Sequence, residues 1–203
     1  VKKCIEAGGD CLKVLLYYSP FEPAHVKEIK HAFVARIGGE CAHYQVPFFL
    51  VFVGYDPAGG EEKGLEFAKQ KPAIVSGSMK EFSKPEYNVD VLKVEVPVNM
   101  EYVEGSRANK SGKVAYTRNE AKDHFRRAAE LAALPFIYLS AGVSDAVFRE
   151  TLELAIDCKD SGHLRTTRAQ QAVATLQEVL LSLRTGRSSK TPVLGTTNPA
   201  ANW

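Results

Sequence analysis

Val89-Asp-Val-Leu-Lys-Val-Glu-Val96 is the stretch that decides the fold expected for this chain. Because successive side chains of a β-strand point to opposite faces, Leu92 and Val94 share an aliphatic face, whereas Lys93 and Glu95 share the other. The aliphatic face suits contact with a layer of helices. Charges inside a sheet are paired or functional, because burying an unpaired charge is costly. The segment therefore predicts an interior strand of a parallel sheet.

Apolar runs of strand length alternate with helix-like stretches on both sides of this segment. The other runs are Cys11–Tyr17, Pro47–Val53 and Pro135–Ser140. The helical stretches are Pro23–Tyr44, Leu65–Phe82, Arg118–Ala133 and Asp145–Asp157. Pro72 and Gly77 predict breaks in the second stretch, and Thr117 and Ser144 are expected to cap the last two. Such alternation predicts parallel strands joined by right-handed crossovers.

Two arrangements of such a sheet compete, an open doubly wound sheet and a closed (β/α)8 barrel. No Gly-x-Gly-x-x-Gly or P-loop motif follows any strand, which removes the nucleotide-binding signals of the open form. A complete barrel takes about 250 residues, whereas this chain has 203. We therefore predict an α/β fold, namely a partial (β/α)8 TIM-type barrel with parallel strands that lacks the leading strands and the usual last strands.

The chain divides into three parts by composition. Residues 1–157 contain the strands and helices of the partial barrel. Residues 158–184 form a divergent segment, in which apolar residues at helical spacing predict one amphipathic helix over 166–184. Residues 185–203 are rich in Ser, Thr, Gly, Pro and Asn, a composition that predicts a disordered tail.

Charge and cysteine content bound the partners and the compartment. Lys and Arg number 26 against 24 Asp and Glu, so a formal net charge of +2 predicts neither a nucleic-acid partner nor a membrane partner. No apolar run approaches the roughly 20 residues of a bilayer-spanning helix. The four cysteines form no Cys-x-x-Cys pair and have no histidine cluster at zinc spacing. We expect reduced thiols, a cytoplasmic location and no metal site.

Two lysines are the strongest candidates for chemistry. Lys93 is either one half of a buried ion pair with Glu95 or a desolvated amine that attacks a carbonyl to form a Schiff base. Lys13 approaches Lys93 if its strand face also points inward, and desolvation and a neighbouring like charge both favour an uncharged amine. Lys13 could instead bind a substrate phosphate as a point charge or, as a strand-end residue, reach solvent.

The segment Tyr138-Leu-Ser-Ala-Gly-Val-Ser-Asp145 joins the last strand to a helix. Ser140 lies at the carboxyl end of the strand, and Gly142 allows a ligand to approach the backbone. A hydroxyl and backbone N–H groups at this place make a phosphate cradle. Ordinary turn chemistry is the alternative interpretation.

These residues lie in motifs that together resemble the tagatose-1,6-bisphosphate aldolase family. The motifs are Lys13-Val-Leu-Leu-Tyr-Tyr18, Pro47-Phe-Phe-Leu50, Val89–Met100 with Val103-Glu-Gly105, and Pro135-Phe-Ile-Tyr-Leu-Ser-Ala-Gly-Val-Ser144. The resemblance runs from Val1 to about Ala155. It implies a class I lyase on a (β/α)8 barrel, without metal or cofactor. Such an enzyme cleaves the small sugar phosphate tagatose 1,6-bisphosphate to dihydroxyacetone phosphate and glyceraldehyde 3-phosphate, and related barrels act on other ketose phosphates, including a sulfosugar phosphate.

The resemblance also implies roles for single residues. Lys93 matches the Schiff-base lysine, Lys13 matches an active-site lysine near the substrate, and Leu139 with Ser140 matches part of the phosphate site. Gly142 is added to that site by the turn chemistry described above. Glu95 completes the set of catalytic candidates as the carboxylate nearest to Lys93 in the sequence.

Two departures from the family pattern predict impaired activity. The family carries a proton-transferring Glu directly after Pro-Phe-Phe-Leu, where this chain has Val51. A late phosphate-binding Cys-Gly-Arg-Ala-Thr-Trp segment is absent. The rival hypothesis is therefore an inactive barrel fragment that binds a sugar phosphate or a protein partner through an exposed sheet edge. A homo-oligomer is compatible with either hypothesis.

Overall fold

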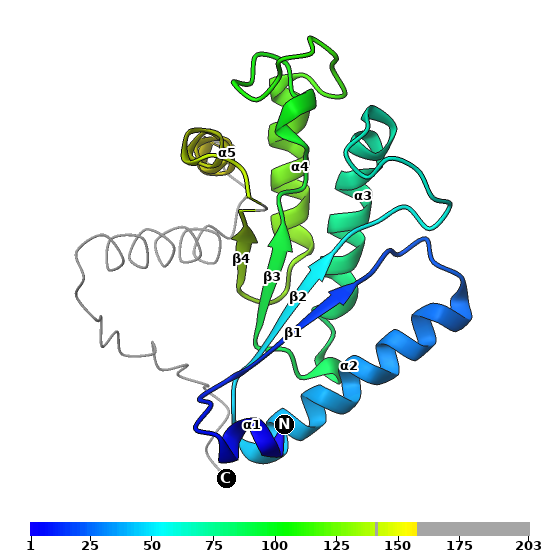
Figure 1. Cartoon of the computed structure of the whole chain (residues 1–203), viewed down its shortest axis with the longest axis vertical. Coiled ribbons are helices and arrows are strands. Elements are labelled where there is room, and N and C mark those ends of the chain that lie inside the picture. The colour runs from blue at the N-terminus through cyan, green and yellow to red at the C-terminus, as the bar shows by residue number, and fades with distance from the viewer. Residues whose placement is uncertain (141, 158–203) are drawn as a thin grey trace, which may run out of the picture.

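A four-stranded parallel sheet forms the centre of the fold. The computed structural model describes residues 1–140 and 142–157, so the helix expected at 166–184 and the tail expected at 185–203 lie outside the described residues. The strands are β1 (Leu12–Tyr17), β2 (Phe48–Val53), β3 (Val91–Glu95) and β4 (Phe136–Leu139). All adjacent pairs are parallel, and the spatial order is β1-β2-β3-β4 (Figure 1). The four predicted strands are confirmed, each slightly shorter than its apolar run.

One short helix precedes β1, and a longer helix follows each strand, after a short 3-10 helix in the case of β3 (Figure 1). They are α1 (Lys2–Glu6), α2 (Ala24–Tyr44), α3 (Leu65–Phe82), α4 (Arg118–Leu131) and α5 (Asp145–Asp157), with short 3-10 helices η1 (Pro85–Tyr87) and η2 (Met100–Tyr102). The Thr117 side chain caps α4 in a reciprocal capping box with Glu120, as the sequence predicts. Ser144 Oγ accepts a hydrogen bond from the Val147 N–H at 3.5 Å in the first turn of α5.

The strand order excludes the doubly wound alternative. In a doubly wound sheet the order reverses at a switch point and helices cover both faces. Here sequential strands lie side by side without reversal, and right-handed crossovers then place the connecting helices on one face. The described residues therefore form a partial (β/α) barrel.

The two faces of the sheet differ sharply in burial. The face toward the helices is fully buried on β2 and β3, at Leu50, Phe52, Leu92 and Val94, and partly buried on β1. The opposite face, here called the inner face, is formed by Lys13, Leu15 and Tyr17 of β1, Phe49, Val51 and Val53 of β2, Val91, Lys93 and Glu95 of β3, and Ile137 and Leu139 of β4. On β1 it is open, since Leu15 is 54% and Tyr17 59% exposed.

The predicted breaks at Pro72 and Gly77 are wrong, because α3 is one continuous helix. Proline has no N–H for the carbonyl four residues earlier, here that of Ala68. The buried Tyr116 hydroxyl donates to this carbonyl oxygen instead. Gly77 is needed for packing, because a Cβ there would lie 2.9 Å from Cγ of Pro20. Tertiary contacts thus compensate for both helix-breaking residues.

Two adjacent glycines of α2 give a matched test of helix packing. A Cβ at Gly38 would lie 1.8 Å from the Tyr87 carbonyl oxygen in η1, whereas a Cβ at Gly39 would meet nothing within 4 Å. We expect Gly38→Ala to lower the free energy of unfolding by about 1–3 kcal/mol through overpacking. Gly39→Ala should raise it by roughly 0.5–1 kcal/mol, because alanine favours a helix. Urea denaturation measures both, and equal effects would contradict the close contact.

The bond from Tyr116 to Ala68 gives a second test. Tyr116→Phe leaves the buried Ala68 carbonyl without a donor and should lower the free energy of unfolding by about 1–3 kcal/mol. Tyr102→Phe is the control, because the Tyr102 hydroxyl makes a solvent-exposed bond to the Lys63 carbonyl at 3.0 Å and water can replace it. In a Pro72→Ala background the restored N–H can bond to the Ala68 carbonyl, so the cost of Tyr116→Phe should shrink. An unchanged cost there contradicts the explanation of the continuous helix.

Candidate active site on the inner face

The strand register sorts the inner face into layers. Leu15 pairs with Val51, Val51 with Lys93, and Lys93 with Ile137, so these four residues form one layer across the sheet. The layer below contains Lys13, Phe49 and Val91. Above Lys93, Glu95 pairs with Leu139 at the carboxyl ends of the strands. Active sites of (β/α)8 barrels lie at this end of the strands.

Lys93 is partly buried in an apolar layer. Its neighbours in register are Val51 on β2 and Ile137 on β4. Among the described residues, no hydrogen bond or ion pair engages its ammonium nitrogen. The sequence alternatives of a Lys93–Glu95 ion pair and a free amine are thereby distinguished, because the ion pair is not formed. A lysine without a carboxylate partner in apolar surroundings has the environment that a nucleophilic amine requires.

Glu95 is held by groups other than Lys93. Its Oε1 lies 3.1 Å from Nζ of Lys71 on α3, and its Oε2 accepts a 2.7 Å hydrogen bond from the N–H of Gly54, directly after β2. Both side chains of the ion pair are largely buried. The carboxylate therefore joins the ends of β2 and β3 to α3. A catalytic role for Glu95 stays a prediction that these contacts do not favour.

Lys13 lies one layer below Lys93 and two strands away. Lys13 pairs with Phe49, which pairs with Val91, whereas Lys93 is two residues beyond Val91. With strands 4.8 Å apart and a rise of 3.3 Å per residue, the two lysine Cα atoms are separated by about 12 Å. The Lys13 side chain is exposed. Long lysine side chains could converge on one ligand across this distance, but the backbones do not bring the two amines together.

Leu139, Ser140 and Gly142 lie at the carboxyl end of β4. Leu139 ends the strand on the inner face, beside Glu95 in register. The Ser140 carbonyl accepts a 3.2 Å bond from the Val143 N–H, which closes a turn ahead of α5. Gly142 has φ +74°, and a Cβ there would meet nothing within 4 Å. The turn is exposed and open to a ligand, so a phosphate role stays compatible with its geometry.

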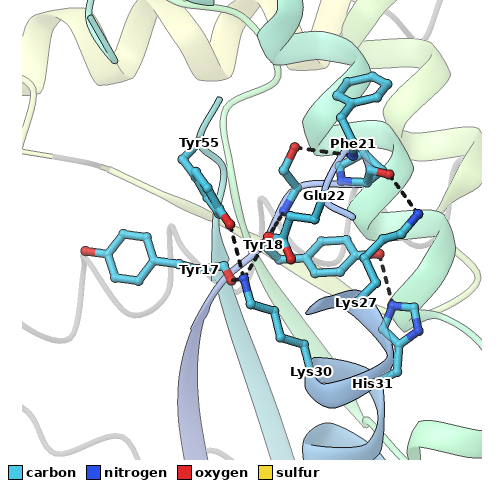
Figure 2. Close-up of polar contacts among 10 residues, drawn as sticks. Tyr17, Tyr18, Phe21, Glu22, Lys27, Lys30, His31 and Tyr55 are labelled. Carbon is cyan, nitrogen blue, oxygen red and sulfur yellow. Dashed lines mark hydrogen bonds and ion pairs between the residues drawn. The ribbon is translucent and has the colours of Figure 1, made fainter. Parts of the chain in front are cut away.

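A polar cluster fixes the carboxyl end of β1 (Figure 2). The Lys30 ammonium group on α2 donates to Glu22 Oε1 at 2.7 Å and to the Tyr17 carbonyl at 2.8 Å. It also lies 3.4 Å from the Tyr55 hydroxyl and over that ring. Burial, followed by the Glu22 carboxylate, raises the pKa of Tyr55. These contacts tie the turn after β1 to α2 and to the segment after β2.

A second polar cluster, around Tyr18 and His31, joins α2 to α3. The Tyr18 hydroxyl and Nε2 of His31 are 3.0 Å apart, and Nε2 is 3.8 Å from Glu81 Oε1 on α3. Burial, aided by the Glu81 and Glu22 carboxylates, raises the pKa of Tyr18. Phe82 stacks edge-on against Tyr18, with ring centroids 4.8 Å apart. This cluster locks α2 to α3 behind the sheet and is structural.

Sequence reasoning missed Lys71, Glu22 and Lys30, three residues that hold the carboxyl ends of the strands. Lys71 lies in a helix with many charged residues, and nothing in its spacing distinguishes it from a surface lysine. Glu22 between Pro20 and Pro23 reads as an ordinary turn residue. A search for buried partners of Glu95 could have suggested a lysine, but not which one.

No group of three or more His, Cys, Asp or Glu side chains could hold a metal ion within residues 1–140 and 142–157. Within the same residues, no helix has the length and hydropathy needed to traverse a bilayer.

Comparison with known proteins shows the family of the chain. Residues 1–167 match the DeoC/LacD family of aldolases. The chain belongs to this family. The match continues beyond Ala155, where the resemblance was expected to end. Tagatose 1,6-diphosphate aldolase of Listeria monocytogenes serotype 4b is 54% identical over 150 residues, or 74% of this chain and 44% of the relative. Tagatose 1,6-diphosphate aldolase 2 of Enterococcus faecalis is 49% identical over the same share of each chain.

Solved aldolase structures share the fold. A Schiff-base-forming fructose-1,6-bisphosphate aldolase matches with a TM-score of 0.50 at 12% identity, over 78% of this chain and 50% of that chain. An archaeal fructose 1,6-bisphosphate aldolase matches with a TM-score of 0.50 at 13% identity, over 92% and 62%. The chain spans about half the length of the curated relatives it matches.

Proposed function

We propose that this chain carries the Schiff-base part of a class I aldolase, with Lys93 as the nucleophile. One observation carries the proposal: Lys93 lies on the inner face, in an apolar layer with Val51 and Ile137. The family of the chain and the names of its relatives support the same chemistry.

The chemistry follows from the amine. The Lys93 nitrogen adds to the ketone carbon of the substrate, and loss of water gives an iminium ion. The iminium accepts the electron pair of the carbon–carbon bond that joins the two halves of the sugar, so an aldehyde leaves. Protonation of the remaining enamine and addition of water release the ketone and regenerate the amine. Each step needs a proton donor or acceptor close to the nitrogen.

The substrate in this proposal is a ketose bisphosphate, and tagatose 1,6-bisphosphate is the one that the names of the relatives indicate. The products would be dihydroxyacetone phosphate and glyceraldehyde 3-phosphate. Ser140 and Gly142, with Leu139 at the strand end, would receive one phosphate at the turn before α5, and Lys13 would attract an anionic substrate from the opposite side of the inner face. The cytoplasm is the compartment in which such a substrate and the free thiols of this chain would occur together.

Trapping the imine tests the assignment of Lys93. We expect borohydride reduction in the presence of dihydroxyacetone phosphate to add one adduct, mapped to Lys93 by peptide mass spectrometry. Lys93→Arg should abolish the adduct, and Lys69→Met on the exposed surface of α3 should leave it unchanged. Absence of an adduct from a folded wild-type chain would favour the inactive fragment. If a sulfosugar phosphate competes with dihydroxyacetone phosphate and forms the preferred adduct on Lys93, the substrate class changes but the Schiff-base chemistry stays.

Val51 gives a second test, because it lies level with Lys93 on the neighbouring strand. The family resemblance implies a proton-transferring Glu at this position, so the present chain should form the imine faster than it cleaves the carbon–carbon bond. We expect Val51→Glu to raise the cleavage rate, towards the roughly 10²–10⁴-fold that general acid–base catalysis contributes. Val51→Gln has a similar size but cannot transfer a proton. Equal rates for the two variants would contradict the explanation.

A further inference from the structure

We propose that Lys71 of α3 is a positioning residue that holds the Glu95 carboxylate away from Lys93, so that the Lys93 amine does not pair with it. The inference concerns the same site as the proposed function and rests on it for its purpose. Its physical content is the charge state of Lys93, which can be measured without any substrate.

Glu95 is close enough to Lys93 to neutralise it. The two residues are separated by one position on β3 and share the inner face by alternation. Their Cα atoms are therefore about 6–7 Å apart, a distance that a glutamate and a lysine side chain readily bridge. An unrestrained carboxylate at this position would form an ion pair with the amine.

Two contacts prevent that ion pair. Glu95 Oε1 lies 3.1 Å from Lys71 Nζ, and Oε2 accepts from the Gly54 N–H at 2.7 Å. The side chains of Glu95 and Lys71 are only 11% and 14% exposed, so solvent screens their attraction little. Both carboxylate oxygens are thus occupied on the side of α3 and the end of β2.

The close approach of α3 to β2 makes this arrangement possible. A Cβ at Gly54 would lie 2.6 Å from Cγ2 of Ile74 on α3, and 3.4 Å from Glu95 Oε2. Ile74 is three residues from Lys71 and hence on the same side of the helix. The absence of a side chain at Gly54 therefore brings Lys71 within reach of Glu95.

Few charged or titratable groups of the four strands face Lys93. β1 contributes Lys13 and Tyr17 to the inner face, and β2 and β4 contribute only apolar side chains. β3 contributes Glu95, and α3 reaches it with Lys71. Glu95 is therefore the one carboxylate on the inner face of the four described strands. Whether the Lys93 amine meets a negative charge therefore depends on whether Glu95 pairs with Lys71.

Removing the Lys71 ammonium group should transfer Glu95 to Lys93. A carboxylate beside an amine favours the charged form, which is not a nucleophile. The neutral fraction of Lys93 would then fall at any pH below the midpoint of its titration. A purely structural ion pair would instead lower stability and leave the titration of Lys93 unchanged.

Competitive labelling of the full chain with acetic anhydride tests this directly. The labelling rate of each lysine, followed by mass spectrometry across a pH series, reports its neutral fraction. For Lys71→Met we expect the Lys93 midpoint to rise by about one pH unit, which means a roughly tenfold slower labelling below it. Lys71→Arg should retain the wild-type profile. In the double variant Lys71→Met/Glu95→Gln the midpoint should return to within about 0.3 pH unit of wild type.

The controls separate this inference from its alternatives. Lys69→Met removes an exposed lysine that pairs with Glu66 at 2.8 Å, so it should not change the Lys93 profile. Circular dichroism establishes that each variant is folded. Glu95→Gln alone removes the negative charge of the pair, and we expect its Lys93 labelling midpoint to be no higher than that of the wild type. An unchanged midpoint in folded Lys71→Met overturns the inference. If the labelling shift is observed but imine trapping fails, the aldolase proposal is overturned and the inference on Lys71 is not.

Discussion

The sequential order of the four parallel strands is the constraint on which the site depends. Since each crossover is right-handed and no strand reverses the order, the connecting helices lie on one face of the sheet. That face takes the aliphatic residues and supplies the hydrophobic stabilisation, with Leu50, Phe52 and Leu92 fully buried. The connecting helices of the described residues leave the other face uncovered, and the Lys93 amine lies there in a largely apolar layer.

Polar clusters at the carboxyl ends of the strands keep this face ordered. Three buried glutamates, each from a different segment, tie a loop to a helix. Glu22 holds Lys30, Glu95 holds Lys71, and Glu150 of α5 accepts from the Arg107 N–H at 3.1 Å and from Arg118 at 3.2 Å. In each case the partners of the carboxylate lie outside the inner face, although Glu22 Oε2 is buried without a hydrogen-bond partner. The result is a rim of ion pairs around Lys93, which has no ion-pair partner among residues 1–140 and 142–157.

Much of the fold could be predicted from the sequence, because strands and helices here follow their hydrophobic periods. The aliphatic alternation in β3 identified both the buried face and the position of Lys93, and the motif at 135–144 placed Ser140 at a strand end. Prediction failed where tertiary contacts decide. The continuity of α3 through Pro72 depends on the Tyr116 hydroxyl, 48 residues away in sequence from the Ala68 carbonyl that it binds. The partner of Glu95 comes from a helix that strand alternation does not describe. An approach of the Lys13 and Lys93 amines stays a prediction, because the distance between the two residues depends on register, which no motif encodes.

A crystal structure of the chain soaked with dihydroxyacetone phosphate and reduced in place tests the central claim most directly. The account predicts continuous electron density from Nζ of Lys93 to the ligand carbon, the phosphate at the turn formed by residues 140–144, and Glu95 still bound to Lys71. Density attached to Lys13 or to a surface lysine, with an empty inner face beside β3, would contradict it.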